Sequence, residues 1–530
     1  MTTDDWTLTD AQRAETVARI RTNVSTMAFF RSAPLPADLV EAAAVAVERK
    51  AYTVARVEAR TTTGMRPHHE TLKAYVRKLS ELVLEVVVSG GQIDGVAVSS
   101  AGAPQGDGTE LDLTGSREFL TQETAEELLA PMLEPGSKIQ KVKFSTKSFG
   151  VEAAEVAARA IRNVSSTLID ADMSDIIAGR PEDEALAALR IISDALSTAR
   201  LLHLNLSDNA LGEKGIRAFA ASFQHQQTLE SIAFQNVGCS VHGCAAVDEL
   251  MQCTGSLKRL HLLNNMSGDE GATSIANVLS RCPAMEDFKM ASSRVGGAGG
   301  IALAKALAVG GASLLTLDIH DNPMTSEIAE ELGSLLYRHP NLKRLNLNDT
   351  CLGDDGVEIV AAALANGAAP VLEELELELN EITVAGAEPL AAALAVKTGL
   401  KKVNLKENEL EDDGALAIAR GLTGLTSLQV LDLCTNQIKR GGVCAVAKAV
   451  SNKMALHLLA LDDNEISEAG IEALQAILRN AGKLEVLGSL EENCPDDDDG
   501  DDEGGEGDEI ESEDDAVDAL AAEFAKKEHL

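Results

Sequence analysis

Aromatic and basic residues are scarce in this chain. Aromatic residues make up 3% of its 530 residues, and lysine and arginine number 46 against 84 aspartates and glutamates. The resulting formal net charge of −38 argues against nucleic acid or an anionic membrane as a direct partner and favours a basic protein surface. Because no apolar run reaches about 18 residues, we expect neither direct membrane insertion nor a secretory leader.

The usual motifs of metal sites and active sites are missing too. The eight cysteines are scattered, without a C-x-x-C pair, and are predicted to be reduced thiols in a cytosolic protein. The phosphate-loop, zinc-protease and nucleophile-elbow motifs do not occur. His68, His69 and Glu70 are predicted to begin a helix rather than hold a metal, because adjacent helical residues point about 100° apart. We therefore expect no metal and no self-contained enzyme.

What the chain does have is a leucine-rich segment that recurs along it, most often every 28 residues. Its pattern is L-x-x-L-x-L-x-x-N-x-L, and its first positions are Ile139, Leu168, Leu201, Leu229, Leu257, Met285, Leu314, Leu342, Leu372, Leu400, Leu428, Leu456 and Leu484. This period is typical of leucine-rich repeats. It predicts an α/β solenoid of the ribonuclease-inhibitor type, with parallel strands on the concave face and helices outside.

One unit shows why the repeats must stack. In the unit that begins at Leu201, Leu204 and Leu206 alternate as in a short strand with one buried face. The side chain of Asn209 can satisfy backbone groups where the chain leaves that strand, and residues 216–223 have helical periodicity. A single unit cannot bury its own apolar face, so the array is expected to fold as one body.

The segments around the repeats predict three further parts. The predicted organisation is a helical domain at 1–90 with helices at 10–27, 36–59 and 69–88, a linker at 91–116, the solenoid at 117–490 with a helical cap at 117–136, and a tail at 491–530. The linker is rich in Gly, Ser and Asp. In the tail, 14 of the 20 residues from 496 to 515 are acidic, and their repulsion predicts disorder.

One repeat has a longer loop between its strand and its helix. The unit that begins at Leu168 spans 33 residues and contains Gly179, Arg180 and Pro181 before an acidic helix start. Long loops on a rigid scaffold often carry functional groups. The turned backbone predicts that the Arg180 guanidinium projects from the surface; the alternative is an ion pair with one of the acidic residues at 182–184.

Three segments resemble the plant type of Ran GTPase-activating proteins. They are Ala178-Gly179-Arg180-Pro181, the block at 204–215 (LNLSDNALGEKG) and the block at 261–271 (HLLNNMSGDEG). The resemblance runs from about Glu118 to the acidic tail. The amino-terminal domain is similar to the WPP domain of the plant proteins, with Trp6, Thr7 and Leu8 at the position of the Trp-Pro-Pro signature.

This resemblance implies that the chain stimulates GTP hydrolysis by Ran. It implies action without an arginine finger, by ordering the switch regions and the glutamine of Ran, which itself holds GTP and magnesium; no cofactor of the chain's own is expected. The implied catalytic residues are Asn236 and Arg180, and the implied partner-binding residues are Asn209, Asp321 and Asn264. Asn264 also rivals Asn236 for the asparagine role. Val237 occupies the usual Asn position, so Asn236 is an extra amide expected on the rim.

The resemblance also implies partners and a location. The partners are Ran-GTP, alone or with a Ran-binding protein, and coiled-coil anchors at the nuclear envelope that bind residues 1–90 through Trp6, Thr7 and Leu8. The location is the cytoplasm, with the cytoplasmic face of the nuclear envelope and, in division, the spindle or cell plate. The roles implied are in nucleocytoplasmic transport and mitosis. The alternative is a non-catalytic scaffold or inhibitor that binds a basic protein with the same arc.

Overall fold

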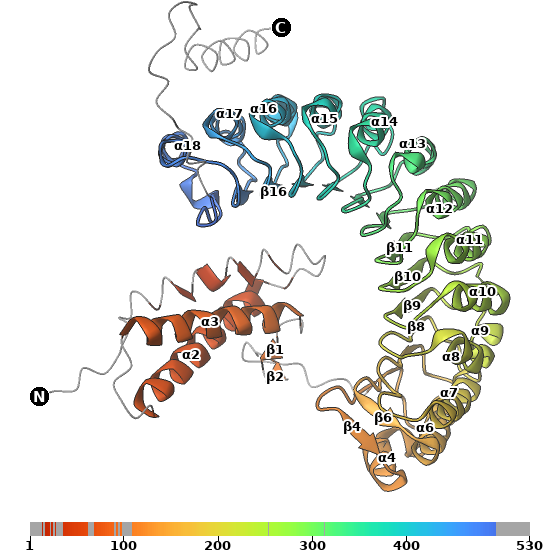
Figure 1. Cartoon of the computed structure of the whole chain (residues 1–530). Helices are drawn as coiled ribbons and strands as arrows, with labels where there is room; N and C mark the ends of the chain where they lie inside the picture. The colour runs from red at the N-terminus through yellow and green to blue at the C-terminus, as the bar shows by residue number, and fades with distance from the viewer. Residues whose placement is uncertain are drawn as a thin grey trace, which may run out of the picture. The chain divides into compact units, whose positions relative to one another are not determined.

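The computed structural model describes residues 37–61, 68–88, 92–93, 96–97 and 109–493 (without 253 and 312), together with single residues between 13 and 35. The chain has two compact units, residues 1–107 and 108–530 (Figure 1). Trp6, Thr7 and Leu8, as well as the acidic run at 496–515, lie outside the described residues. In the described part, no helix is both long and apolar enough to cross a membrane.

The first unit is helical, as predicted. It contains α2 (Ala37–Thr61) and α3 (His68–Val88), which pack against each other, and the described residues from 13 to 27 are also helical. Glu48 is buried between them, where its carboxylate accepts bonds from Arg13 (2.6 Å) and the Tyr75 hydroxyl (3.2 Å). Burial and this carboxylate raise the pKa of Tyr75 to about 12. Two short antiparallel strands, β1 (Gln92–Ile93) and β2 (Val96–Ala97), lie in the predicted linker.

The second unit is a solenoid with one parallel sheet along its inner face (Figure 1). In order, the thirteen strands of this sheet are β3 (Glu110–Asp112), β5 (Lys141–Lys143), β7 (Asp170–Asp172), β8 (His203–Asn205), β9 (Ser231–Gln235), β10 (Arg259–Leu263), β11 (Asp287–Ala291), β12 (Thr316–Asp318), β13 (Arg344–Asn346), β14 (Glu374–Glu376), β15 (Lys402–Asn404), β16 (Val430–Asp432) and β17 (Leu458–Ala460). Each strand pairs with the strand of the next repeat, which confirms the predicted architecture.

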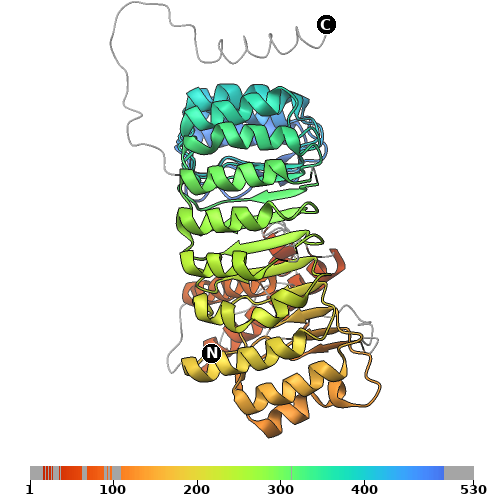
Figure 2. The same cartoon turned by 90° about the vertical axis from the view of Figure 1, so that its right-hand side faces the viewer.

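The helices form a single outer layer, seen side by side in Figure 2. They are α6 (Val151–Asn163), α7 (Glu182–Leu196), α8 (Gly212–Ala218), α9 (Ala220–His225), α10 (Val241–Leu250), α11 (Gly268–Leu279), α12 (Gly297–Val309), α13 (Ala329–Arg338), α14 (Gly353–Ala365), α15 (Val384–Val396), α16 (Glu411–Gly421), α17 (Arg440–Val450) and α18 (Glu468–Asn480), with 3₁₀ turns at Ser326–Ile328, Leu422–Gly424 and Leu484–Val486. The core between strands and helices is built from the repeat leucines.

The register of the sheet follows the leucine pattern. Leu204 pairs with Ile232, which pairs with Leu260, and Phe288 follows in the same row. These side chains are all buried. Because the same repeat position recurs on every strand, identical faces meet and the core continues from one repeat to the next.

The predicted start of the solenoid is wrong. The sheet begins at β3, within the predicted linker, because Leu111 pairs with Val142 of β5. The Gly- and Asp-rich composition around residue 110 hides this short strand in the sequence. The predicted helical cap at 117–136 contains α4 (Gln122–Leu128) and α5 (Ala130–Leu133), but it also contributes a strand, β4 (Glu118–Leu120), which pairs with β6 (Lys147–Phe149) outside the main sheet.

Two kinds of turn follow the strands, and they largely alternate from one repeat to the next. In the first kind, the residue three after the Asn position has positive φ and its N–H donates to a main-chain oxygen of the next repeat, as Gly212 donates to Val237 O (3.0 Å). In the second, the residue directly after the Asn position has positive φ, as at Arg294. In this second kind of turn, two backbone N–H groups donate to the side chain of the asparagine at the Asn position of the next repeat: Ser293 N and Val295 N reach Asn322 Oδ1 at 3.1 and 3.0 Å. We call the residues at the Asn position of successive repeats the asparagine ladder.

This alternation explains which asparagines the ladder needs. An asparagine that follows a turn of the second kind must accept backbone N–H groups, whereas one that follows a turn of the first kind receives none. Asn436 is of the latter sort: within the described residues its buried Oδ1 has no partner. The same freedom allows Val237 and Ser293 to replace asparagine.

An aspartate in the first turn of one helix caps the start of the helix in the next repeat. Asp269, in the first turn of α11, accepts bonds from Gly296 N (2.7 Å) and Gly299 N (3.0 Å) at the start of α12. Asp354 caps α15 in the same way through Thr383 N and Gly386 N, both at 2.9 Å. These carboxylates satisfy amino-terminal N–H groups of the neighbouring helix and complement its dipole.

The ladder gives a stability prediction with an internal control. Asn322→Ala leaves two buried N–H groups unsatisfied, at a cost of about 1–3 kcal/mol each. Asn436→Ala removes a side chain that is equally buried but accepts no bond. We expect Asn322→Ala to lower the free energy of unfolding by about 2 kcal/mol more than Asn436→Ala, measured by urea denaturation. Equal losses of unfolding free energy in the two variants would contradict the distinction between the two kinds of turn.

A buried histidine gives a pH prediction. His339 Nε2 donates to Leu307 O (3.1 Å) and its Nδ1 accepts from Leu314 N (3.3 Å), so both nitrogens are satisfied in the neutral ring. Burial lowers the pKa of His339 below 6.5. The unfolded chain therefore binds this proton more readily, and the stabilisation is complete above the unfolded pKa and decreases as the pH falls below it.

We expect the wild type to lose more stability between about pH 7.5 and about pH 5.5 than His339→Gln does. The exposed His242→Gln is the control, and it should follow the wild type. The measurement is the free energy of unfolding at each pH. A His339→Gln variant with the same pH dependence as the wild type would contradict the assignment.

Candidate functional site

The candidate site lies on the edge of the sheet where the strands end. In the repeats that begin at Ile139 through Leu456, the residue just before the Asn position has positive φ. These residues, which we call the ridge, are Thr146, Asp175, Asp208, Asn236, Asn264, Ser292, Asp321, Asp349, Leu379, Glu407, Thr435 and Asp463. Asp and Asn tolerate this backbone conformation better than most residues. Because the strands are parallel, all ridge residues lie on the same edge.

Three of the implied site residues belong to the ridge: Asn236, Asn264 and Asp321. All three are exposed. The turn at Gly179 and Arg180 follows ridge residue Asp175 and therefore lies on the same edge, two strands from β9. The arrangement thus brings the implied asparagines and the arginine loop onto one continuous surface.

The two rival asparagines are hydrogen-bonded to each other. Asn264 Nδ2 donates to Asn236 Oδ1 at 3.2 Å, and Asn236 Nδ2 donates to Asp208 Oδ1 at 3.2 Å. We call these three residues the amide chain. The Asp208 carboxylate can only accept, so it orients the Asn236 amide with its NH₂ group toward Asp208 and its oxygen toward Asn264. One N–H of each amide remains available to a partner.

Asn209 lies below the ridge and not on it. Its buried side chain accepts from Ile176 N (2.9 Å) and donates to Met173 O (2.8 Å) and Leu206 O (2.9 Å). All of its bonds serve the backbone of two neighbouring repeats. The implied role of Asn209 as a direct partner contact is therefore corrected to a structural one.

Arg180 does not project from the surface, and that prediction is wrong. Its side chain is 14% exposed and forms an ion pair with Glu184 (3.2 Å), which confirms the alternative of pairing with a neighbouring acid. Its guanidinium also donates to Ser148 Oγ (3.1 Å), Ser148 O (2.8 Å) and Leu120 O (3.2 Å). It therefore ties the start of α7 to the strand pair β4–β6.

An aromatic ring completes the surroundings of Arg180. The guanidinium carbon lies 5.0 Å from the centre of the Phe119 ring, a cation–π distance. Gly179 has φ +75°, and a Cβ there would lie 2.7 Å from Phe119 Cζ. Glycine is thus needed both for the backbone conformation and for the close approach of the ring. Phe119 itself is 58% exposed beside this loop.

Charged clusters on the concave face were missed by the sequence analysis. Asp318 Oδ1 lies 2.6 Å from His320 Nδ1, and Asp318 Oδ2 lies 2.8 Å from Lys289 Nζ. Burial opposes ionisation of Asp318, but His320 and Lys289 outweigh it and lower its pKa to about 2. A second cluster joins Asp287 to His261 (2.9 Å) and Arg259 (2.8 Å). Opposite charges at outward strand positions one repeat apart are the signal that could have found them.

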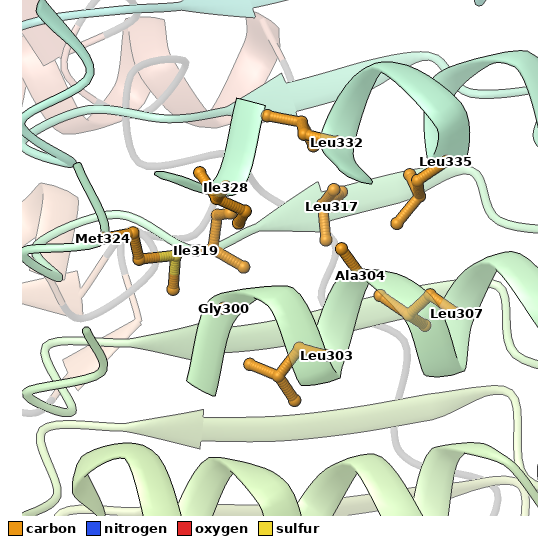
Figure 3. A pocket seen from close by; sticks show the side chains of 10 residues that line it. All are labelled: Gly300, Leu303, Ala304, Leu307, Leu317, Ile319, Met324, Ile328, Leu332 and Leu335. Carbon is orange, nitrogen blue, oxygen red and sulfur yellow. The ribbon is translucent and has the colours of Figure 1, made fainter. Parts of the chain in front are cut away.

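A small cavity lies inside the solenoid rather than at this edge. It has a volume of about 10 Å³ and lies between α12 and the repeat of β12, lined by Gly300, Leu303, Ala304, Leu307, Leu317, Ile319, Met324, Ile328, Leu332 and Leu335 (Figure 3). A Cβ at Gly300 would lie 2.9 Å from Met324 Sδ. The apolar lining and small volume suit neither a ligand nor a well-bonded water.

Comparison with known proteins agrees with this geometry. A family model for the "Leucine Rich repeat" matches residues 201–220, 338–361, 368–391 and 397–419. The parallel inner sheet and the outer helices agree with it. The chain has the leucine-rich-repeat fold.

Curated relatives of this chain include Ran GTPase-activating proteins and ribonuclease inhibitors. "RAN GTPase-activating protein 1" of Arabidopsis thaliana is 43% identical over 160 residues, which cover 30% of this chain and 29% of that protein. "Ran GTPase-activating protein 1" of Xenopus laevis is 31% identical and covers 36% and 35%. "Ribonuclease inhibitor" of Sus scrofa is 24% identical and covers 38% and 51%. The matches therefore span about a third to a half of the length of these relatives.

The contacts of Arg180 predict a local effect of its removal. Arg180→Ala should destabilise the β4–β6 pair, because Leu120 O and Ser148 O lose their donor, at a cost of about 1–3 kcal/mol. We expect faster hydrogen exchange at residues 118–120 and 147–149 and a lower free energy of unfolding. The control is Arg190→Ala, which removes an exposed arginine from α7, the helix that follows Arg180. Unchanged exchange at both segments would contradict the bridging role.

Proposed function

We propose that the chain is a GTPase-activating protein for Ran that acts in trans through the carboxyl-end edge of its sheet. The observation that carries this proposal is the 43% identity to a plant protein with that name. Its support from the structure is that the loop of Arg180 and the amide chain lie on the same edge. Ran would hold GTP and magnesium, and this chain would supply no cofactor.

The amide chain suits a positioning role. A neutral amide both donates and accepts, so Asn236 or Asn264 can hold the side chain of a glutamine that orients the attacking water. Their backbones are fixed by hydrogen bonds to neighbouring repeats. Asp208 orients the Asn236 amide, which in turn accepts from the Asn264 amide, so little ordering is needed when the partner binds. An acceleration of about 10⁵ corresponds to about 7 kcal/mol of barrier, which is within reach of positioning and preorganised polar groups.

Arg180 suits an organising role rather than that of an arginine finger. Its guanidinium makes four polar contacts within its own chain and holds Glu184 and β4–β6 in place. It would shape the edge against which Ran docks. Asp321, farther along the ridge, would be an additional contact with Ran. Residues 1–90 would direct the protein to the nuclear envelope from the cytoplasm.

A second function is favoured by one observation, the 24% identity to a ribonuclease inhibitor. A non-catalytic scaffold of this kind would use the same acidic arc to bind a basic protein. The higher identity to the Ran GTPase-activating proteins favours the first function, and the two differ in whether Ran hydrolyses GTP faster.

The deciding experiment is single-turnover GTP hydrolysis on purified Ran. We expect strong acceleration by the wild type and a loss of about 100-fold or more in Asn236→Ala and Arg180→Ala. The matched control for Asn236→Ala is Asp463→Ala, which removes an exposed side chain at the same positive φ on a distant repeat. Arg190→Ala controls for Arg180→Ala. Absence of stimulation at micromolar protein would leave the scaffold function.

A double-mutant cycle with the same assay tests whether Asn236 and Asn264 act as one unit. Because Asn236 and Asn264 share a hydrogen bond, their effects should not add. We expect the variant that carries both Asn236→Ala and Asn264→Ala to lose little more activity than Asn236→Ala alone. Strictly additive losses would show two independent contacts with Ran and contradict a single functional unit.

A further inference from the structure

Two thiols meet directly below the turn that carries Asn236. Cys239 lies three residues after Asn236, and Cys244 is the fourth residue of α10. Their sulfur atoms are 3.3 Å apart, and both side chains are 0% exposed. A disulfide has an S–S distance of about 2.05 Å, so the sulfurs need to approach by about 1.2 Å to form one.

The surroundings hold both thiols against each other. Cys239 N donates to Asn265 Oδ1 (2.9 Å), and Cys239 O accepts from the Ser267 hydroxyl (3.0 Å), so the next repeat fixes its backbone. Helix α10 fixes Cys244 from the other side. A Cβ at Gly243 would lie 3.3 Å from Cys239 Sγ, so glycine lets the helix pack closely on the turn.

Cys244 has the surroundings that favour a thiolate. Cys244 Sγ has Cys239 as a hydrogen-bond partner and contacts the Ser267 hydroxyl at 3.4 Å, and these contacts lower its pKa. Cys244 also lies near the amino terminus of α10, where the helix dipole favours a thiolate. This position at the start of α10 makes Cys244 the better nucleophile, and Cys239 is the thiol that attacks second.

We propose that Cys239 and Cys244 are a dithiol site that a peroxide oxidises to an intrachain disulfide in the folded protein. The Cys244 thiolate, whose proton has been released, attacks the peroxide and breaks its O–O bond. This step leaves a sulfenic acid at Cys244 and a hydroxide, which takes up a proton and becomes the first water. The Cys239 thiol then attacks this sulfur, forms the S–S bond and releases a second water. Two thiols are oxidised, and one hydrogen peroxide is reduced to two waters.

The fold sets the rate and the consequence of this reaction. Both sulfurs are buried, so the peroxide reacts only when the short turn above them opens; Gly238 at the surface of that turn is exposed. The new bond shortens the sulfur separation and pulls on Cys239. The bonds from Cys239 to Asn265 and Ser267 then shift, and the turn that begins at Asn236 shifts with them.

The test uses the full folded chain, treated with hydrogen peroxide and then alkylated under denaturing conditions. Mass spectrometry should find Cys239 and Cys244 joined by a disulfide within one peptide and protected from alkylation, and dithiothreitol should reverse this. Cys282→Ala is the control, because it removes a buried thiol that is not in this pair. The disulfide between Cys239 and Cys244 should form in this variant as it does in the wild type. Cys239→Ala should instead accumulate a sulfenic acid at Cys244 that dimedone traps.

Full alkylation of both cysteines in the treated wild type overturns the proposal, as does linkage that appears only in denaturant. This readout needs no variant and does not depend on Ran. A second readout rests on the proposed function: the oxidised protein should stimulate Ran several-fold less than the reduced protein, and Cys244→Ala should not respond to peroxide. If the disulfide forms while no form of the protein stimulates Ran, the proposed function fails and the dithiol site stands.

Discussion

The solenoid depends on how the backbone is satisfied where each strand ends. A side-chain amide at this point supplies the hydrogen-bond partners of the backbone that a neighbouring strand supplies elsewhere in a sheet. Asn322 alone accepts two backbone N–H groups and donates to three carbonyl oxygens. Because these bonds reach into the preceding repeat, they fix the spacing of repeats as well as the turn. Every other feature of the edge follows from this fixed spacing.

The ridge is a direct consequence of that turn. The residue before each asparagine must adopt positive φ, and short polar residues do so at the least cost, so Asp and Asn occupy most of the ridge. The requirement of the backbone thus places a row of exposed polar side chains on one edge. The amide chain arises where three of them, Asp208, Asn236 and Asn264, come within hydrogen-bond distance at a separation of 28 residues each. The constraint that shapes the turn also shapes the surface proposed to bind Ran.

The same reasoning explains an irregularity in the repeat of Asn236. Val237 takes the place of a ladder asparagine, which the sequence alone cannot justify. The preceding turn at Gly212 donates to the main-chain oxygen of Val237 and needs no side-chain acceptor. This substitution therefore leaves no buried N–H group at Gly212 without a partner. Asn436 shows the converse, since it keeps the asparagine and leaves its oxygen without a partner in the described chain.

How far the sequence could predict these features depends on the range of the interactions. The strands and their register follow from the leucine pattern, which is local and repeats. The neighbours of Asn236 were in principle predictable, because ridge residues recur at a fixed interval. The surroundings of Arg180 were not, since Leu120 and Ser148 lie 60 and 32 residues earlier in the chain. Their strands, β4 and β6, form a pair outside the repeat pattern, so the periodicity of the sequence does not predict this pair.

The burial of Arg180 bears on the mechanism as well as on prediction. To reach a phosphate in another protein, the guanidinium would have to leave Glu184, both partners at Ser148, and Leu120 O. Hydrogen bonds of a charged group are worth about 1.5–3 kcal/mol each, so release would cost several kcal/mol before any new contact formed. An arginine that is held in this way contributes more by fixing the edge than by moving. The amide chain is already exposed and oriented, so it needs no comparable release, which favours the amides over Arg180 in the proposed contact with Ran.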